Sequence, residues 1–354
     1  MNFGFCNALY GELTLPQNLA KARELGFSCY ETTAWALLKR QKFDGGRAVV
    51  REHLEDFSLL DEIGSAMAMT GVGICCIHGP CPGVKLGDPD FDDKFYLYEA
   101  LLERMKKLGI KLLLHHAGNS NLGDFQEGAN RPMWEAITCS LRKLRDTAAD
   151  YDVELTIETG SGAQDLTRPE ALRRLFDEVE GLYWAIDVQH AYRPGLWTFD
   201  EYFEAVGDRL NHMHVPDGEG FISHGGIPGK GGIDWRRVMQ LVRRTGFDGA
   251  AVIETDLRAI QFILGYYLAM MKEEGFDQAQ MPGIDYAAPN EYRYGNRVEG
   301  NTKLNPSFIR MPTAMITLTD APKDEASAPD IRDLVIVTAR KQLQRFWKES
   351  EAGE

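Results

Sequence analysis

Histidines and carboxylates recur along this chain at intervals that suit a single metal or proton-transfer site. Six of them follow one another with gaps of 27 to 42 residues: His78, His116, Glu158, Asp187, His214 and Glu254. Imidazole and carboxylate groups together suit Mn²⁺, Fe²⁺, Co²⁺ or Zn²⁺, whereas calcium prefers oxygen ligands alone. Gathered without a cation, these groups would repel one another or stay unpaired. Their types therefore predict a divalent-metal site if the fold brings them together.

Each of these six residues ends a short run with the character of a strand. Runs such as Ile74-Cys75-Cys76-Ile77 and Leu112-Leu113-Leu114 are apolar throughout, which is typical of parallel strands buried on both faces. Eight strands are predicted on this basis: Phe3–Asn7, Ser28–Thr32, Gly73–His78, Lys111–His116, Glu154–Glu158, Tyr183–Asp187, Leu210–Val215 and Gly249–Glu254.

Helical segments separate these strands. Their apolar positions recur at helical spacing, as at Leu101, Met105 and Leu108. The predicted helices are Leu15–Leu25, Arg51–Thr70, Phe91–Leu108, Pro132–Asp150, Arg168–Val179, Phe199–Arg209, Trp235–Thr245 and Ala259–Glu274. This strict alternation predicts an α/β fold, a (β/α)8 TIM barrel over residues 1–275. A doubly wound sheet would need a glycine-rich phosphate-binding turn after an early strand, and the sequence has none.

The carboxyl ends of all strands meet at one mouth of such a barrel, and active sites are built there. The six histidines and carboxylates are therefore expected around a single mouth. Taken singly, a histidine at a strand end is usually a structural group, and a carboxylate there often caps the next helix. We expect that packing role for His115 and His212, because each has a better-placed histidine one or two residues away.

Four segments near the ends of the later strands resemble the signature segments of the xylose isomerase-like TIM-barrel superfamily: Ile157-Glu158-Thr159, Ile186-Asp187-Val188-Gln189-His190, His212-Met213-His214-Val215-Pro216-Asp217 and Val252-Ile253-Glu254. This superfamily includes sugar isomerases and epimerases, inosose dehydratases and endonuclease IV. The resemblance covers residues 1–275 and implies one catalytic divalent metal ion, with Mn²⁺ expected and Mg²⁺, Co²⁺, Fe²⁺ or Zn²⁺ as alternatives. Its implied ligands are Glu158, Asp187, His214 and Glu254. In the ketose 3-epimerases the two glutamates also act as acid and base, which implies that role for Glu158 and Glu254.

Six further residues are expected to contact the substrate: His190, His116, His78, His224, Glu31 and Lys230. The resemblance implies that His190 contacts a substrate oxygen, and that residues 223–235 form the glycine-rich loop that closes one side of the sugar site. Lys230 in this loop can neutralise an anionic group or remain solvated. Glu31 ends the second predicted strand and either lines the pocket or caps a helix.

His78 and His116 also match positions that bind additional metal ions in the endonuclease IV branch, and in the isomerase branch they line the sugar pocket. A third-metal cluster in the former branch needs an aspartate two residues before a histidine, but Ile222 holds that place before His224. The net charge of −14, from 39 Lys+Arg and 53 Asp+Glu, also disfavours binding to nucleic acid or to an anionic membrane surface. We therefore expect a small sugar-like substrate.

The composition, 44% hydrophobic and 26% charged, is that of a globular chain. No stretch approaches the roughly 20 apolar residues of a membrane span, and Met1–Cys6 does not begin like a secretory signal. The six cysteines form no CxxC pair, so we expect reduced thiols and a cytoplasmic location.

The last part of the chain differs in composition. Residues 280–354 hold six of the fifteen prolines and no histidine or cysteine. A C-terminal extension is predicted over residues 276–354, irregular at Asn290–Pro312 and closing with a helix near Ile331–Trp347. Its aromatic and aliphatic residues would be unfavourable in water, so we expect it to dock. Assembly is the expected use, in a homo-oligomer or with a small partner subunit, and local covering of the barrel is the alternative.

These patterns predict a metal-dependent isomerase or epimerase of carbohydrate metabolism, which removes a proton next to the carbonyl of a sugar or keto-polyol. The same proton abstraction would serve a lyase or dehydratase acting on a keto-sugar or inosose, including the barrel subunit of a C-glycoside deglycosidase. A DNA-repair enzyme similar to endonuclease IV is disfavoured by the charge. A non-catalytic assembly subunit is disfavoured by the complete set of metal-ligand side chains.

Overall fold

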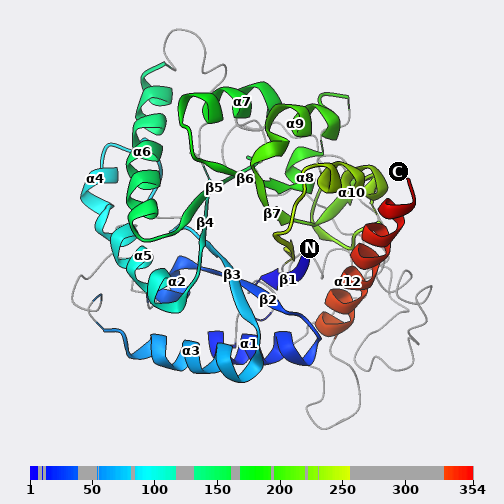
Figure 1. Cartoon of the computed structure of the whole chain (residues 1–354), viewed down its shortest axis with the longest axis horizontal. Coiled ribbons are helices and arrows are strands. Elements are labelled where there is room, and N and C mark those ends of the chain that lie inside the picture. Colours follow the sequence, from blue (N-terminus) through cyan, green and yellow to red (C-terminus); the bar gives the residue numbers. More distant parts are fainter. Residues whose placement is uncertain are drawn as a thin grey trace, which may run out of the picture.

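The computed structural model describes residues 1–6, 10, 13–38, 54, 56–80, 84–116, 131–160, 168–192, 195–219, 222–229, 231–255 and 331–353 of the chain. Within these residues, parallel strands close into a barrel in the order β1-β10-β7-β6-β5-β4-β3-β2 (Figure 1). The barrel strands are β1 (Asn2–Cys6), β2 (Cys29–Thr33), β3 (Gly73–His78), β4 (Leu112–His115), β5 (Glu154–Glu158), β6 (Tyr183–Asp187), β7 (Leu210–His214) and β10 (Ala250–Ile253). The predicted (β/α)8 TIM barrel is confirmed.

Helices surround the barrel on its outside (Figure 1). They are α1 (Leu15–Glu24), α2 (Ala34–Leu37), α3 (Ser58–Thr70), α4 (Phe91–Lys94), α5 (Tyr96–Leu108), α6 (Arg131–Asp150), α7 (Pro169–Glu178), α8 (Val188–Ala191), α9 (Phe199–Val206), α10 (Trp235–Arg244) and α12 (Ile331–Glu349), with short 3₁₀ turns η4 (Gly207–Arg209) and η6 (Ser350–Gly353). The helix predicted over residues 91–108 is divided into α4 and α5. The helix predicted over residues 259–274 lies outside the described residues.

Local signals in the sequence explain several helix ends. The Thr14 side chain accepts a hydrogen bond from the Gln17 backbone, and the Gln17 side chain accepts one from the Thr14 backbone, so a capping box begins α1. Helices α3 and α5 end at Gly71 and Gly109, whose φ angles of 68° and 70° lie in the left-handed region that favours glycine. These caps determine where each helix stops and the next strand begins.

Side chains alternate between the two faces of every barrel strand. Leu155 and Ile157 of β5 pack outward under the helices in the main hydrophobic core. Cys6, Cys29, Ala250 and Val252 form a separate small cluster, as do Cys76, Leu112, Leu114 and Ala185. Because these residues alternate along their strands with members of the main core, the two small clusters fill the inside of the barrel. The same alternation turns Glu158 inward, toward the barrel axis.

The closing helix α12 docks on the barrel of its own chain, beside α10 (Figure 1). Its buried side chains are Val335, Ile336, Ala339, Leu343 and Phe346. The Phe346 ring stacks on Trp235 of α10 with the ring centroids 6.5 Å apart. On the other side, Asp333 accepts hydrogen bonds from the Tyr10 hydroxyl at 2.6 Å and from Lys21 Nζ of α1 at 2.8 Å. Helix α12 therefore lies between α10 and α1 in the outer ring.

The remainder of the predicted extension, residues 276–330, lies outside the described residues, and its use in assembly stays a prediction. No helix in the described ranges is both long and apolar enough to cross a membrane. The described cysteines are free thiols: Cys6, Cys29, Cys75, Cys76 and Cys139.

Candidate metal centre and active site

Four of the predicted metal ligands converge at the carboxyl ends of their strands. Glu158 and Asp187 end β5 and β6, His214 ends β7, and Glu254 directly follows β10. Each can offer one ligand atom such that all four atoms lie within 4.8 Å of one another. Glu158, Asp187 and His214 are buried, while the Glu254 side chain is 39% exposed. The geometry therefore brings together the four ligands that the family resemblance implies and leaves one of them open to the mouth.

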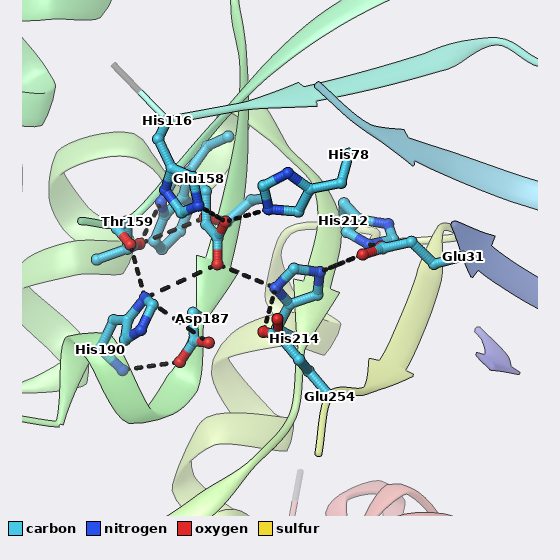
Figure 2. Close-up of polar contacts among 12 residues, drawn as sticks. Glu31, His78, His116, Glu158, Thr159, Asp187, His190, His212, His214 and Glu254 are labelled. Carbon is cyan, nitrogen blue, oxygen red and sulfur yellow. Dashed lines mark hydrogen bonds and ion pairs between the residues drawn. The ribbon is translucent and has the colours of Figure 1, made fainter. Parts of the chain in front are cut away.

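His214 lies at the centre of this cluster (Figure 2). Its Nδ1 is 2.9 Å from Glu158 Oε1 and 3.0 Å from Glu254 Oε2. Its Nε2 is 3.0 and 3.1 Å from the two carboxylate oxygens of Glu31 on β2. One Nδ1 atom carries one proton at most, so it cannot donate a full hydrogen bond to both Glu158 and Glu254.

Glu31 and His212 lie in the barrel beside His214. The sequence assigned His212 to packing as a structural group, and the structure confirms this role inside the barrel, where the buried ring places Nε2 2.7 Å from Glu31 Oε2. The reason is the pleat of β7, because residues two apart share one face and His214 already points inward. His115 also takes its expected packing role, since it turns outward on β4 and hydrogen-bonds the Tyr98 hydroxyl of α5. Glu31 is only 2% exposed, with both oxygens in contact with imidazole nitrogens.

His78 and His116 both approach the second carboxylate oxygen of Glu158 (Figure 2). Their Nε2 atoms are 3.5 and 3.2 Å from Glu158 Oε2, and their ring centroids are 4.9 Å apart. Together with Glu158 they form a second group of ligand-type atoms that could hold a cation. Their side chains are 17% and 31% exposed, so both also reach the open mouth.

His190 is brought to the mouth by the short helix α8. Asp187 caps this helix by accepting a hydrogen bond from the His190 backbone N–H at 2.7 Å. The His190 Nδ1 lies 3.0 Å from the Thr159 carbonyl oxygen. A carbonyl only accepts hydrogen bonds, so Nδ1 carries a proton, and Nε2 is an acceptor in the neutral ring and a donor in the protonated ring. His190 can therefore accept a hydrogen bond from a hydroxyl group at the mouth or donate one to it.

Burial, neighbouring histidines and neighbouring carboxylates together shift the pKa values of the buried carboxylates. Burial alone would raise the pKa of Glu158, but His116 and His214 outweigh it and hold this pKa well below its usual range. Burial raises the pKa of Asp187 to about 6, with the Glu158 and Glu254 carboxylates adding to the shift and His190 opposing it. The surrounding histidines thus favour the ionised form of Glu158, whereas burial and the neighbouring carboxylates oppose ionisation of Asp187, a cost that a cation would offset.

The imidazoles show the complementary effect. Burial would lower the pKa of His214, but the Glu31, Glu254 and Glu158 carboxylates raise it well above its usual value. Burial likewise opposes the positive charge on His190, and Asp187 together with Glu158 raises the pKa of His190. The carboxylates around His214 therefore favour a positive charge at this imidazole, and either a proton or a metal ion can supply it.

These residues fit a divalent cation. Three carboxylate oxygens and one imidazole nitrogen are the ligand chemistry that Mn²⁺, Fe²⁺, Co²⁺ and Zn²⁺ accept. A cation among Glu158, Glu254 and the His214 Nδ1 would satisfy the crowded contacts that a single proton cannot. Among the described residues, moreover, no aligned hydrogen-bond donor meets the buried Glu158 Oε2.

A loop anchor that the sequence analysis did not identify lies beside the mouth. Asp217 is buried, and its carboxylate accepts hydrogen bonds from the backbone N–H groups of Gly218 and Gly229 and from the Trp235 indole, each at 2.7 Å. Gly231 leaves no room for a Cβ beside this carboxylate. Asp217 therefore ties the described ends of the glycine-rich loop to β8. The signal was the aspartate that closes the segment His212-Met213-His214-Val215-Pro216-Asp217.

Two expected substrate contacts, His224 and Lys230, belong to the glycine-rich region, which the structure describes only in part. The glycine-rich region contains an antiparallel hairpin of β8 (Asp217–Glu219) and β9 (Ile222–Gly226), which the sequence did not predict. His224 belongs to β9, but its side chain lies outside the description, and Lys230 lies outside the described residues altogether. Their contacts with substrate stay predictions.

Comparisons with known proteins agree with this geometry. A family model described as "Xylose isomerase-like TIM barrel" matches residues 19–278. Over a stretch of 53 residues the chain is 34% identical to fructoselysine 3-epimerase of Shigella flexneri. This stretch is 15% of the chain and 19% of that protein, so the chain spans about a fifth of the length of the curated relative it matches.

Several solved structures share the fold. An L-ribulose 3-epimerase superposes with a TM-score of 0.60 at 14% identity, covering 99% of this chain and 96% of the other. A D-psicose 3-epimerase crystallised in the presence of D-fructose has a TM-score of 0.58 at 17% identity and covers 72% and 85%. The 3-keto-D-glucoside 4-epimerase from E. coli has a TM-score of 0.58 at 18% identity and covers 78% and 100%. At these identities the likeness concerns the fold.

Proposed function

Since the chain belongs to the xylose isomerase-like TIM-barrel family, we propose that it is a divalent-metal-dependent isomerase or epimerase. Its substrate is a sugar or keto-polyol, from which it removes the proton next to the carbonyl group. The observation that carries the proposal is the convergence of four ligand-type side chains on an open mouth: Glu158, Asp187, His214 and Glu254. A scaffold without chemistry has no need to bury two carboxylates beside a third at an open mouth, because burying like charges together costs stability.

One divalent ion, Mn²⁺ in the first instance, is held by these four residues. When bound, such an ion polarises a substrate carbonyl and so favours loss of the neighbouring proton. The chain's own part is to present the ligands already gathered, with Asp187 held by its cap on α8 and His214 held between β6 and β10 in the sheet. The low exposure of the site limits competing water.

Glu158 and Glu254 are proposed to move the proton. They approach the His214 Nδ1 from different strands, β5 and β10, which are separated by β6 and β7 in the barrel. Carboxylates on two sides of a bound carbon can deprotonate one face and reprotonate the other. Glu254 is 39% exposed and meets the substrate from the mouth, whereas Glu158 acts from the buried side.

The histidines at the rim are proposed to bind substrate oxygens. His190, His78 and His116 are 15%, 17% and 31% exposed at the side chain, so each keeps surface toward the mouth. His224 and Lys230 extend this set from the glycine-rich loop. The names of the similar proteins, which are ketose 3-epimerases and a 3-keto-D-glucoside 4-epimerase, support a keto-sugar as the substrate. We place the enzyme in the cytoplasm as a homo-oligomer or with a small partner subunit.

Solvent isotope exchange tests the proposal. Protein loaded with Mn²⁺ is incubated in D₂O with ketoses and 3-keto-glycosides, and deuterium at the carbon next to the carbonyl is followed by NMR. Glu158→Gln and Glu254→Gln should each lower the exchange rate by about 100- to 10,000-fold. Glu154→Gln is the matched control, because Glu154 lies at the other end of β5 and contacts Asn211 instead of the site.

Three outcomes decide the reaction class. Exchange with a rearranged sugar as product supports the isomerase or epimerase. Exchange or proton loss with an unsaturated product assigns the lyase or dehydratase alternative, which uses the same base. If no keto-sugar or inosose exchanges a proton with solvent, the proposed function is wrong.

A further inference from the structure

Glu31 lies on the side of the His214 ring opposite Glu158 (Figure 2). It comes from β2, more than 180 residues before its partners on β7. Both of its oxygens contact His214 Nε2, at 3.0 and 3.1 Å, and Oε2 also lies 2.7 Å from His212 Nε2. Glu31, His212 and His214 are at most 2% exposed, so this contact is sealed from the open mouth.

The chemistry of this contact determines which nitrogen of His214 carries the proton. An ionised carboxylate has acceptor oxygens only, so Nε2 must be the protonated nitrogen. In the neutral ring Nδ1 is then a lone pair, and it points at Glu158 Oε1 and Glu254 Oε2. A lone pair aimed at two carboxylate oxygens is unfavourable, so Nδ1 takes up either a second proton, which can meet only one of them fully, or a metal ion, which can meet both. Imidazole ligands of metal ions commonly donate their other N–H to a carboxylate, which orients the ring.

We propose that Glu31 is a positioning residue that keeps the proton of His214 on Nε2 and directs Nδ1 to the metal ion. The metal part of this inference rests on the proposed function. His212 completes the device, because its own hydrogen bond holds Glu31 Oε2 in place. Glu31 acts through His214. This role differs from the substrate contact that was expected from the place of Glu31 at the end of a strand.

Glu31, His212 and His214 also lie close enough together to hold a separate cation. A hydrogen-bonded arrangement accounts for the same atoms better, since each imidazole Nε2–H meets a carboxylate oxygen at hydrogen-bond distance. It also leaves the His214 Nδ1 free for the four-ligand cluster. A cation bound to Nε2 would remove the proton that the neighbouring carboxylate accepts.

The first test reads the proton directly. In histidine-¹⁵N-labelled protein, the His214 Nε2–H proton should give a downfield, slowly exchanging signal, with or without Zn²⁺ as a diamagnetic probe. Glu31→Leu should abolish this signal, and Glu31→Gln, which keeps one acceptor oxygen, should retain it in shifted form. Tyr98→Phe is the matched control, because it removes a buried hydrogen bond from a different histidine, His115.

The second test measures Mn²⁺ affinity by isothermal titration calorimetry. Glu31→Leu should weaken binding by about 10- to 100-fold, Glu31→Gln by less, and Tyr98→Phe should leave it unchanged. A Glu31→Gln or Glu31→Leu protein that folds and keeps both the proton signal and the affinity of the unmodified chain overturns the inference. If the unmodified chain binds no divalent ion, the proposed function fails instead, and the proton signal still decides the role of Glu31.

Discussion

The barrel mouth and the contact between α12 and the barrel arrange their charged groups in opposite ways. We call this contact the α12 seam; it comprises Asp333, Arg340 and the apolar face of α12. In the seam each charge meets a partner: Asp333 meets Lys21, and Arg340 donates to the carbonyls of Leu25 and Gly26. At the mouth, Glu158, Asp187 and Glu254 lie close enough to share one ion, and their nearest partners are histidines. The seam is thus built for stability and the mouth for binding a cation.

This difference implies a rule for substitutions. Removing the Asp187 charge at the mouth relieves repulsion but removes a proposed metal ligand, whereas removing a group in the seam costs stability and spares the site. Such a trade-off is common where an active site stores unfavourable contacts. Substitution of Asp187 and substitution in the seam should therefore change the stability of the metal-free protein in opposite directions.

The largest effect is expected at the mouth. Glu158→Ala combined with Asp187→Ala removes two of the four proposed ligands, so Mn²⁺ binding should become undetectable by calorimetry and isotope exchange should be lost. The far-ultraviolet circular dichroism should remain that of the unmodified barrel. Unchanged metal content in the folded double variant would falsify the site assignment.

In the seam, Leu343→Ala tests packing without charge. Leu343 is fully buried against the barrel, so its truncation should destabilise the fold by about 2–5 kcal/mol in urea unfolding. Mn²⁺ affinity of the folded variant should not change, because the seam lies outside the mouth. Gln344→Ala, at the exposed neighbouring position, is the control and should have little effect. Equal stabilities of the two variants would contradict the docking of α12.

Much of this contrast was visible in the sequence. The predicted strands Gly73–His78, Glu154–Glu158 and Tyr183–Asp187 coincide with β3, β5 and β6. Continuous apolar runs that end in a polar residue mark β3 and β6, whereas polar and apolar residues alternate along β5. The convergence of the six candidate residues followed from barrel geometry, since every parallel strand ends at one mouth, whereas the choice of four metal ligands came from the family resemblance.

Contacts between distant segments were not visible. The partners of Glu31 lie on β7, and the role of Asp217 depends on its hydrogen bonds from Gly229 and Trp235, which lie farther along the chain. No local pattern encodes such pairings, because they depend on how loops return across the barrel. The placement of α12 between α1 and α10 is of the same kind. His212 is different: the two-residue repeat of a strand already placed it on the face of His214.

A smaller effect of opposite sign is expected from Asp187→Asn. The amide keeps an oxygen for the cap on α8 but removes one of the crowded charges. Metal-free protein should therefore become more stable by about 0.5–2 kcal/mol in urea unfolding. With saturating Mn²⁺ the order should reverse, because the unmodified chain gains binding energy. Asp208→Asn, at an exposed position outside the mouth, is the control. Destabilisation of the metal-free Asp187→Asn protein would show that the carboxylates do not repel.

The smallest effect concerns the charge pair of the seam. Lys21 and Asp333 are 2.8 Å apart, and each side chain is 18% exposed. Burial would lower the pKa of Lys21, but Asp333 and Glu24 raise it above 10.5. The pair therefore stabilises the fold below pH 10.5 and loses this contribution as pH rises through the raised pKa.

Lys21→Met keeps the aliphatic stem, so it should cost up to about 1 kcal/mol at pH 7, and the difference from the unmodified chain should shrink above pH 10.5. Lys107→Met breaks a more exposed pair with Glu103 and should cost less. If both variants lose the same stability, or if the Lys21→Met deficit persists at high pH, the seam does not depend on charge pairing.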